Sequence, residues 1–169
     1  SSMPTGPKHL YVVALGSNQR HHRYGRPSQV IVAALHALND DGLNILTSAP
    51  IIETAPIGPS RRRYANSAAV VETDLSPEQL LDLLKITEAS FGRRRGQRWG
   101  TRTLDLDIIL WSGGIYSAPG LSIPHRLFRA RDFVLRPLLA IVPQWVDPIS
   151  GRSVRQLFAT LKRSARESG

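Results

Sequence analysis

RWGTRTLDLDIILW, at residues 98–111, carries more information about this chain than any other segment. Apolar residues dominate its second half and predict a strand, although Asp105 and Asp107 fall within it. Side chains alternate between the two faces of a strand, so these two acids share one face. By the same alternation, the acids' face also holds Thr103, Ile109 and Trp111, and the opposite face holds Leu104, Leu106, Ile108 and Leu110.

The two acids predict a site for a divalent cation. Neighbouring carboxylates repel each other, a bound cation removes the repulsion, and hard oxygen ligands favour Mg²⁺ or Ca²⁺. Arginine pairs well with phosphate oxygens, and five arginines lie just upstream or within the segment: Arg93, Arg94, Arg95, Arg98 and Arg102. Acids and arginines together indicate a polyphosphate site. The alternative is a solvated polar face, which the apolar residues expected beside the acids disfavour.

Composition limits the class of protein. The 169 residues are 41% hydrophobic and 21% charged, which fits one globular domain with its own core. The absence of cysteine excludes disulfides and thiolate chemistry. No apolar run reaches the length of a membrane span and no secretory leader is visible, so we expect a cytoplasmic protein. We expect residues 1–7 to be a tag remnant and disordered N-terminus, and residues 8–165 to form the domain.

The charge balance indicates an anionic partner. The formal net charge is +9, and only three of the 22 basic residues are lysines: Lys8, Lys85 and Lys162. Arginine recognises phosphate in a bidentate manner better than lysine does. Nucleic acid and a nucleotide polyphosphate both satisfy this requirement.

The order of predicted elements indicates an α+β fold. We expect strands at 9–15, 44–54 with a break at Pro50, 65–73, within 98–111 and at 115–123, and helices at 28–40, 77–91, 132–142 and 153–163. The first six elements, up to the acid-bearing strand, follow the β-α-β-β-α-β order of a ferredoxin-like sandwich with a mainly antiparallel sheet and a C-terminal helical appendage. Helices would cover one face and leave the other for loops and ligand.

The helix at 77–91 has the clearest start signal. Ser76 is an expected N-cap, Pro77 takes the first helical position, and Gln79 completes a capping-box spacing. Its predicted core face is Leu80, Leu83, Leu84, Ile86 and Phe91.

Several motifs in a fixed order resemble the 6-hydroxymethyl-7,8-dihydropterin pyrophosphokinase family of the folate pathway. The most specific is R-W-G-x-R-T-L-D-L-D at 98–107. The others are weaker alone: LGSN at 15–18, ETAPIG at 53–58, YAN at 64–66, FGRRR at 91–95, IPH at 123–125 and RDFVL at 131–135. The resemblance runs from residue 15 to about residue 143 and implies a ferredoxin-like fold.

The resemblance also implies a reaction and its residues. The family transfers the β,γ-diphosphate of ATP to the hydroxymethyl group of a reduced pterin and releases AMP. Asp105 and Asp107 would hold two Mg²⁺ ions, and Arg93 and Arg102 would contact the phosphates. The implied nucleotide site is Glu88, Arg94, Arg95, Ser122, Pro124, His125 and Arg131. The implied pterin site is Thr54, Pro56, Ile57, Tyr64, Asn66 and Phe133, with the ring between Tyr64 and Phe133.

Three other function classes are alternatives to this one. A nucleic-acid-binding module explains the charge but not the paired acids, and no recognised RNA- or DNA-binding signature occurs. A nucleotidyltransferase also combines a Gly-Ser turn with D-x-D, but its two elements lie close in sequence, unlike Ser17 and Asp105 here. A silent binder would not need Asp105, Asp107 and Arg102 intact. We therefore expect small-molecule substrates, ATP and the pterin, with no nucleic-acid or membrane partner, and a monomer.

Overall fold

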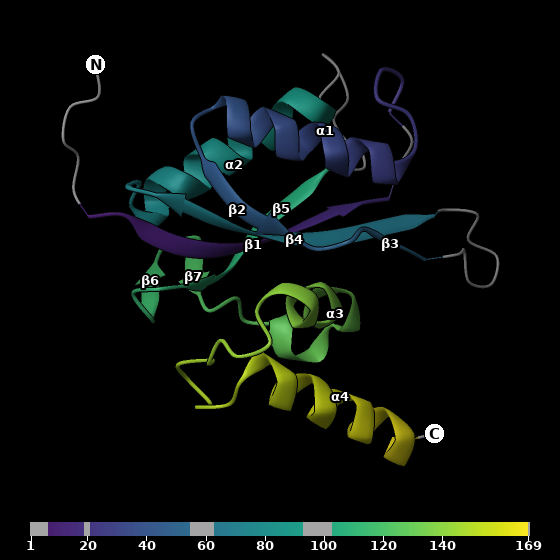
Figure 1. Cartoon of the computed structure of the whole chain (residues 1–169), viewed down its shortest axis with the longest axis vertical. Helices are drawn as coiled ribbons and strands as arrows, with labels where there is room; N and C mark the ends of the chain where they lie inside the picture. Colours follow the sequence, from purple (N-terminus) through teal and green to yellow (C-terminus); the bar gives the residue numbers. More distant parts are fainter. Residues whose placement is uncertain (1–6, 19–20, 55–62, 93–102, 169) are drawn as a thin grey trace.

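The computed structural model describes residues 7–18, 21–54, 63–92 and 103–168 (Figure 1). Its centre is a five-stranded sheet in which every pairing is antiparallel. The strands are β1 (His9–Ser17), β2 (Asn44–Ser48), β3 (Ile52–Thr54), β4 (Tyr64–Thr73) and β5 (Asp105–Trp111). Their order is β2-β4-β1-β5, and β3 also pairs with β4. This arrangement confirms the predicted ferredoxin-like α+β fold.

Helices cover both faces of the sheet. Figure 1 shows α1 (Pro27–Asp40) and α2 (Pro77–Gly92) on one side, and α3 (Asp132–Ile141) and α4 (Val154–Ser168) on the other. The first helix pair packs over a core that includes Tyr11, Val13 and Leu106. The second core includes Val12 and Val70 from the opposite sheet face. The predicted C-terminal helices therefore bury part of the face that we expected to stay open.

Two predicted strands are each divided. The strand expected at 44–54 is β2 and β3, with the break at 49–51, where Pro50 was expected to interrupt it. The segment at 115–123 forms a two-stranded hairpin of β6 (Tyr116–Ala118) and β7 (Leu121–Ile123). Gly120 lies in its turn with φ of +79°, a conformation that side-chain-bearing residues avoid. A 3-10 helix, η1 (Phe128–Ala130), precedes α3.

A β-bulge changes the predicted face assignment of β5. Val12 pairs with Leu110 and Val13 pairs with Ile108, so Ile109 has no partner in the register with β1. One extra residue reverses the alternation that follows it. Leu110 therefore packs in the α3–α4 core and Trp111 against the α1–α2 core. The prediction for these two residues was wrong, whereas Asp105, Asp107 and Ile109 share a face as expected.

The start of α2 confirms the capping box. The Ser76 backbone N–H donates to Gln79 Oε1 at 2.9 Å, and the Gln79 N–H donates to Ser76 Oγ at 3.3 Å. The core face was predicted less well, because Ile86 is 66% exposed and Thr87 takes the buried position beside it. Within the described part of the chain, no helix is long and apolar enough to cross a membrane.

Candidate active site

Two cavities adjoin at the acid-bearing strand. The larger, of about 750 Å³, lies over the ends of β1, β4 and β5, and the smaller, of about 420 Å³, lies between β5 and the β6–β7 hairpin. Asp107 and Arg131 line both cavities. A ligand group bound between these two side chains would therefore lie where the two cavities join.

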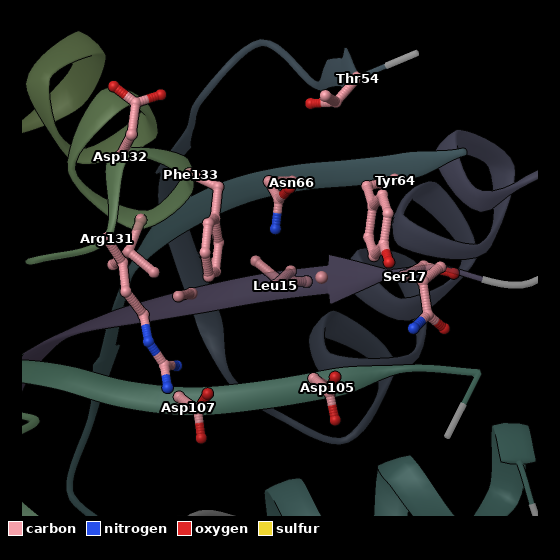
Figure 2. Close-up of a pocket in the computed structure, with 14 residues that line it drawn as sticks. Leu15, Ser17, Thr54, Tyr64, Asn66, Asp105, Asp107, Arg131, Asp132 and Phe133 are labelled. Atoms are coloured by element: carbon pink, nitrogen blue, oxygen red, sulfur yellow. The ribbon is translucent and has the colours of Figure 1, made fainter. Parts of the chain in front are cut away.

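The acids lie near the start of β5, at the edge of the sheet. Asp105 is exposed and Asp107 is partly buried, and both line the larger cavity (Figure 2). Their partners across β1 are Gly16 and Ala14. Neither partner has a long side chain that could fill the cavity in front of the carboxylates.

The donor set of this pair suits Mg²⁺. Mg²⁺ is usually bound through one or two carboxylates, substrate phosphates and several waters, without a complete protein cage. Asp105 and Asp107 supply such carboxylates on one face of one strand. In the described residues, no group of three or more His, Cys, Asp or Glu side chains could hold a metal ion.

Two aromatic rings border the larger cavity. Tyr64 begins β4 and Phe133 lies in the first turn of α3, and Figure 2 shows them on either side of Asn66. Tyr64 is 42% exposed and Phe133 is 48% exposed, which is high for rings of this size. Two exposed aromatic rings on opposite sides of one cavity can stack on a flat heterocycle bound between them.

Asn66 offers an amide between the two rings. It pairs with Gly16 in the register of β4 and β1, and a Cβ built on Gly16 would lie 3.1 Å from Asn66 Nδ2. The glycine therefore makes room for the amide. A carboxamide donates and accepts hydrogen bonds, so Asn66 can recognise the edge of a heterocycle. Thr54, the last residue of β3, pairs with Tyr64 and lines the same cavity.

The smaller cavity contains His125 and Ser122. The His125 backbone N–H donates to the Ile109 carbonyl at 3.0 Å, and His125 Nδ1 accepts from the Leu127 N–H at 3.2 Å. Burial lowers the pKa of the His125 imidazole below its ordinary value, Asp107 opposes this effect, and Arg131 and Arg126 add to it. A neutral ring whose Nδ1 is an acceptor carries its proton on Nε2, which is then a donor. Pro124 is buried just before His125 and does not line this cavity.

Arg131 connects the two cavities. It precedes α3, and its guanidinium carbon lies 5.7 Å from the centroid of the Phe133 ring. The guanidinium therefore lies near the Phe133 ring, which borders the larger cavity, and Arg131 also lines the smaller cavity. The position suits an anion that spans both spaces.

Glu88, on α2, lies behind the acids. Its Oε2 accepts a 2.7 Å hydrogen bond from the Leu106 backbone N–H, and Leu106 is the residue between Asp105 and Asp107. Glu88 lines neither of the two cavities.

The remaining predicted site residues lie outside the described residues. These are Pro56, Ile57, Arg93, Arg94, Arg95 and Arg102. Their roles stay predictions.

Some cavity residues were not predicted from the sequence. Asp132 lines the larger cavity, where Arg136 and Lys162 pair with it. Burial raises the pKa of this carboxyl, but hydrogen bonds from Lys162 and Arg136 outweigh burial and lower it. Its position before Phe133, in the acidic first turn of a helix, was a signal available in the sequence. Leu81 lines the smaller cavity from α2, and only the folded chain places it there.

Comparison with known proteins gives one family. Residues 12–143 match the family described as 7,8-dihydro-6-hydroxymethylpterin-pyrophosphokinase (HPPK). The chain is 39% identical over 149 residues to 2-amino-4-hydroxy-6-hydroxymethyldihydropteridine pyrophosphokinase of Pseudomonas aeruginosa, covering 87% of this chain and 88% of that protein. It is also 39% identical over 140 residues to the protein of the same name from Haemophilus influenzae, covering 82% and 84% of the two chains.

Solved structures share the fold. The HPPK-DHPS structure from Plasmodium falciparum superposes with a TM-score of 0.70 over 95% of this chain, at 14% sequence identity. The chain spans 42% of the length of that protein. At this identity the similarity concerns the fold alone.

Proposed function

The chain belongs to the 7,8-dihydro-6-hydroxymethylpterin-pyrophosphokinase family, and from that premise we propose the reaction and the residues that carry it out. It is a pterin pyrophosphokinase of folate synthesis. In the proposed reaction, the hydroxymethyl oxygen of 6-hydroxymethyl-7,8-dihydropterin attacks the β-phosphorus of ATP. The new O–P bond forms, the bond from the β-phosphorus to the oxygen it shares with the α-phosphate breaks, and AMP leaves with that oxygen. The proton of the hydroxyl is released to solvent.

One observation carries this proposal: the two cavities share Asp107 and Arg131. The residues expected to hold the pterin that are described line the larger cavity: Thr54, Tyr64, Asn66 and Phe133. Ser122, His125 and Arg131, expected to hold the nucleotide, line the smaller one. Two substrates bound in these cavities would meet at Asp107 and Arg131, and transfer between them requires such proximity.

The larger cavity would orient the pterin. Its flat ring would stack between Tyr64 and Phe133, and Asn66 would pair with the polar edge of the ring. Thr54 extends the polar wall on the side of β3, and Pro56 and Ile57 are proposed to complete it. The hydroxymethyl group would then point toward Asp105 and Asp107.

The smaller cavity would hold the nucleotide and its phosphates. The Nε2–H of neutral His125 and the guanidinium of Arg131 would donate to phosphate oxygens, and Ser122 would contribute a hydroxyl. We propose that Arg93 and Arg102, with Arg94 and Arg95, neutralise the remaining phosphate charge. Charge-assisted hydrogen bonds of this kind are shorter and stronger than neutral ones.

Asp105 and Asp107 are proposed to hold two Mg²⁺ ions. Such a pair of ions neutralises charge on both the attacking and the leaving oxygen of a phosphoryl transfer. The residues of the chain would then supply position, since both carboxylates lie on one strand and line the larger cavity, and Asp107 also lines the smaller one.

The test is to identify the nucleotide product. The protein is incubated with ATP, Mg²⁺ and 6-hydroxymethyl-7,8-dihydropterin, and the products are separated by HPLC. The proposal predicts AMP and a pterin diphosphate in equal amounts, formed only when the pterin is present, and lost in Asp105→Ala. Formation of ADP would mean transfer of a single phosphate and would overturn the assignment.

A further inference from the structure

We propose that Glu88 is a positioning residue for the two acids and acts on them through the backbone of β5. The inference rests on the proposed function, because it assigns Glu88 a part in presenting Asp105 and Asp107 to Mg²⁺. The family resemblance places Glu88 in the nucleotide site. In this structure Glu88 also contacts the strand itself, through the 2.7 Å hydrogen bond from the Leu106 N–H to Glu88 Oε2.

The position of β5 in the sheet explains why such a contact is needed. Among the described residues, β5 is an edge strand, with β1 on one side and no sheet neighbour on the other. In an antiparallel ladder, successive residues direct their backbone groups alternately toward the partner and away from it. Leu106 directs its N–H away from β1, to the free edge, where Glu88 accepts it. Without this acceptor, the Leu106 N–H would be an unpaired donor at the sheet edge, and the end of β5 would be held less firmly.

The hydrogen bond to Glu88 holds Leu106, the residue between the two acids. Leu106 separates Asp105 from Asp107, and its own side chain is 3% exposed in the α1–α2 core. The buried side chain and the bonded N–H together fix the peptide units that carry the two carboxylates. The other end of the contact, Glu88, lies on α2, whose Leu80, Leu84 and Phe91 are buried in that same core. The helix therefore serves as a rigid support for the acid-bearing end of β5.

A second hydrogen bond, between backbone groups, holds β5 two residues beyond Asp107. The carbonyl of the bulged residue Ile109 accepts the His125 N–H at 3.0 Å. Between these two anchors lies Asp107, the acid that lines both cavities. Carboxylates that bind metal need such oriented supports, and loss of a supporting partner costs about 10- to 100-fold in metal affinity or activity.

The test compares Glu88→Ala with Glu88→Gln. Glutamine keeps an oxygen that accepts the Leu106 N–H, although the bond is weaker without the charge. In the metal-free protein without substrates, amide exchange at Leu106 should become faster in Glu88→Ala and stay slow in Glu88→Gln. In steady-state assays, Glu88→Ala should lower kcat by about 10- to 100-fold and raise the Mg²⁺ concentration needed for half-maximal rate. Its KM for ATP should change little, and Glu88→Gln should retain most of kcat.

Controls separate this role from a loss of folding. Asp82→Ala removes an exposed carboxylate from the same helix and should leave exchange at Leu106 and kcat as in the unsubstituted protein. Amides of β1 and β4 should stay protected in Glu88→Ala, so that faster exchange is confined to the acid-bearing end of β5. If amides throughout Glu88→Ala exchanged faster, that variant would be unfolding and Glu88→Gln would decide the test. The inference requires that Leu106 exchange stays slow and kcat stays high in Glu88→Gln.

Other results would overturn the inference. Leu106 exchange that is equally slow in Glu88→Ala would show that the hydrogen bond does not hold the strand. A higher KM for ATP in both variants, with kcat unchanged, would show a direct nucleotide contact that needs the charge. Either result could occur in a protein that still forms AMP and the pterin diphosphate, so it would leave the proposed function standing.

Discussion

The His125 backbone N–H donates a 3.0 Å hydrogen bond to the carbonyl of Ile109, the residue that the bulge adds to β5. A bulged residue leaves the regular ladder, so its carbonyl is free to take a partner outside the sheet. Here the partner is the segment that follows β7 and lines the smaller cavity. The bulge thus joins the acid-bearing strand to the proposed nucleotide site.

Replacing Asp107 should abolish turnover without removing the pterin site. Asp107→Asn should lower kcat by at least about 100-fold, because loss of a mere supporting partner already costs about 10- to 100-fold. The Kd of the pterin, measured by its fluorescence, should change little. Asp132→Asn is the matched control: it alters another acid of the same cavity, one already paired with Arg136 and Lys162, and should keep most of kcat.

The two aromatic walls should contribute to pterin affinity by stacking. Tyr64→Ala and Phe133→Ala should each raise the Kd of the pterin about tenfold, since loss of an aromatic ring stacked on a flat base costs about 1 to 3 kcal/mol and 1.4 kcal/mol is tenfold. Tyr64→Phe keeps the ring and should bind almost normally. Calorimetric titration with the pterin measures all three, and an unchanged Kd in both alanine variants would contradict stacking.

Gly16 should matter for binding through Asn66. In Gly16→Ala, the new Cβ would lie 3.1 Å from Asn66 Nδ2 and would push the amide out of place, raising the Kd of the pterin. The effect should largely vanish in an Asn66→Ala background, where no amide remains to be displaced. A double-mutant cycle on pterin binding checks this, and an equal effect of Gly16→Ala in both backgrounds would argue against the contact.

Asp147 should stabilise the fold at neutral pH. It is fully buried and accepts hydrogen bonds from Arg129 at 2.9 Å, from Ser150 at 2.6 Å and from the Ile149 N–H at 3.0 Å. Burial alone would raise the pKa of this carboxyl, but these bonds lower it below its ordinary value. Asp147→Asn should lower the free energy of unfolding by about 3 kcal/mol at pH 7.

The same contact fixes the sign of a pH effect. An acid whose pKa is lower in the folded state stabilises the protein above its unfolded pKa of about 3.9, and the stabilisation is lost as the pH falls through the folded value. The difference between unsubstituted protein and Asp147→Asn should therefore begin to shrink below about pH 4. Urea unfolding at several pH values measures it, and a difference that stays constant down to pH 2 would contradict this assignment.

Much of the fold was predictable because its signals are local. The capping box of α2 and the strand-and-helix order each arise from neighbouring residues. The face of Asp105 and Asp107 followed from alternation alone. The predictions for Leu110 and Trp111 failed because the bulge at Ile109 is set by pairing with β1, and no local pattern announces it.

The site divides in the same way. Asn66 and Phe133 were predicted from the order of short motifs, and both line the larger cavity. The contact of Glu88 with Leu106 could not be predicted, because it depends on how α2 packs against β5. The covering of the second sheet face by α3 and α4 likewise depends on long-range packing.

The fate of the β-phosphate tests the central claim most directly. The protein is incubated with ATP carrying ³²P at the β-position, together with Mg²⁺ and 6-hydroxymethyl-7,8-dihydropterin, and the label is located after chromatography. The account predicts that all transferred label appears in the pterin diphosphate and that the AMP formed is unlabelled. Label that remains with the nucleotide as ADP, beside an unlabelled pterin phosphate, would contradict it.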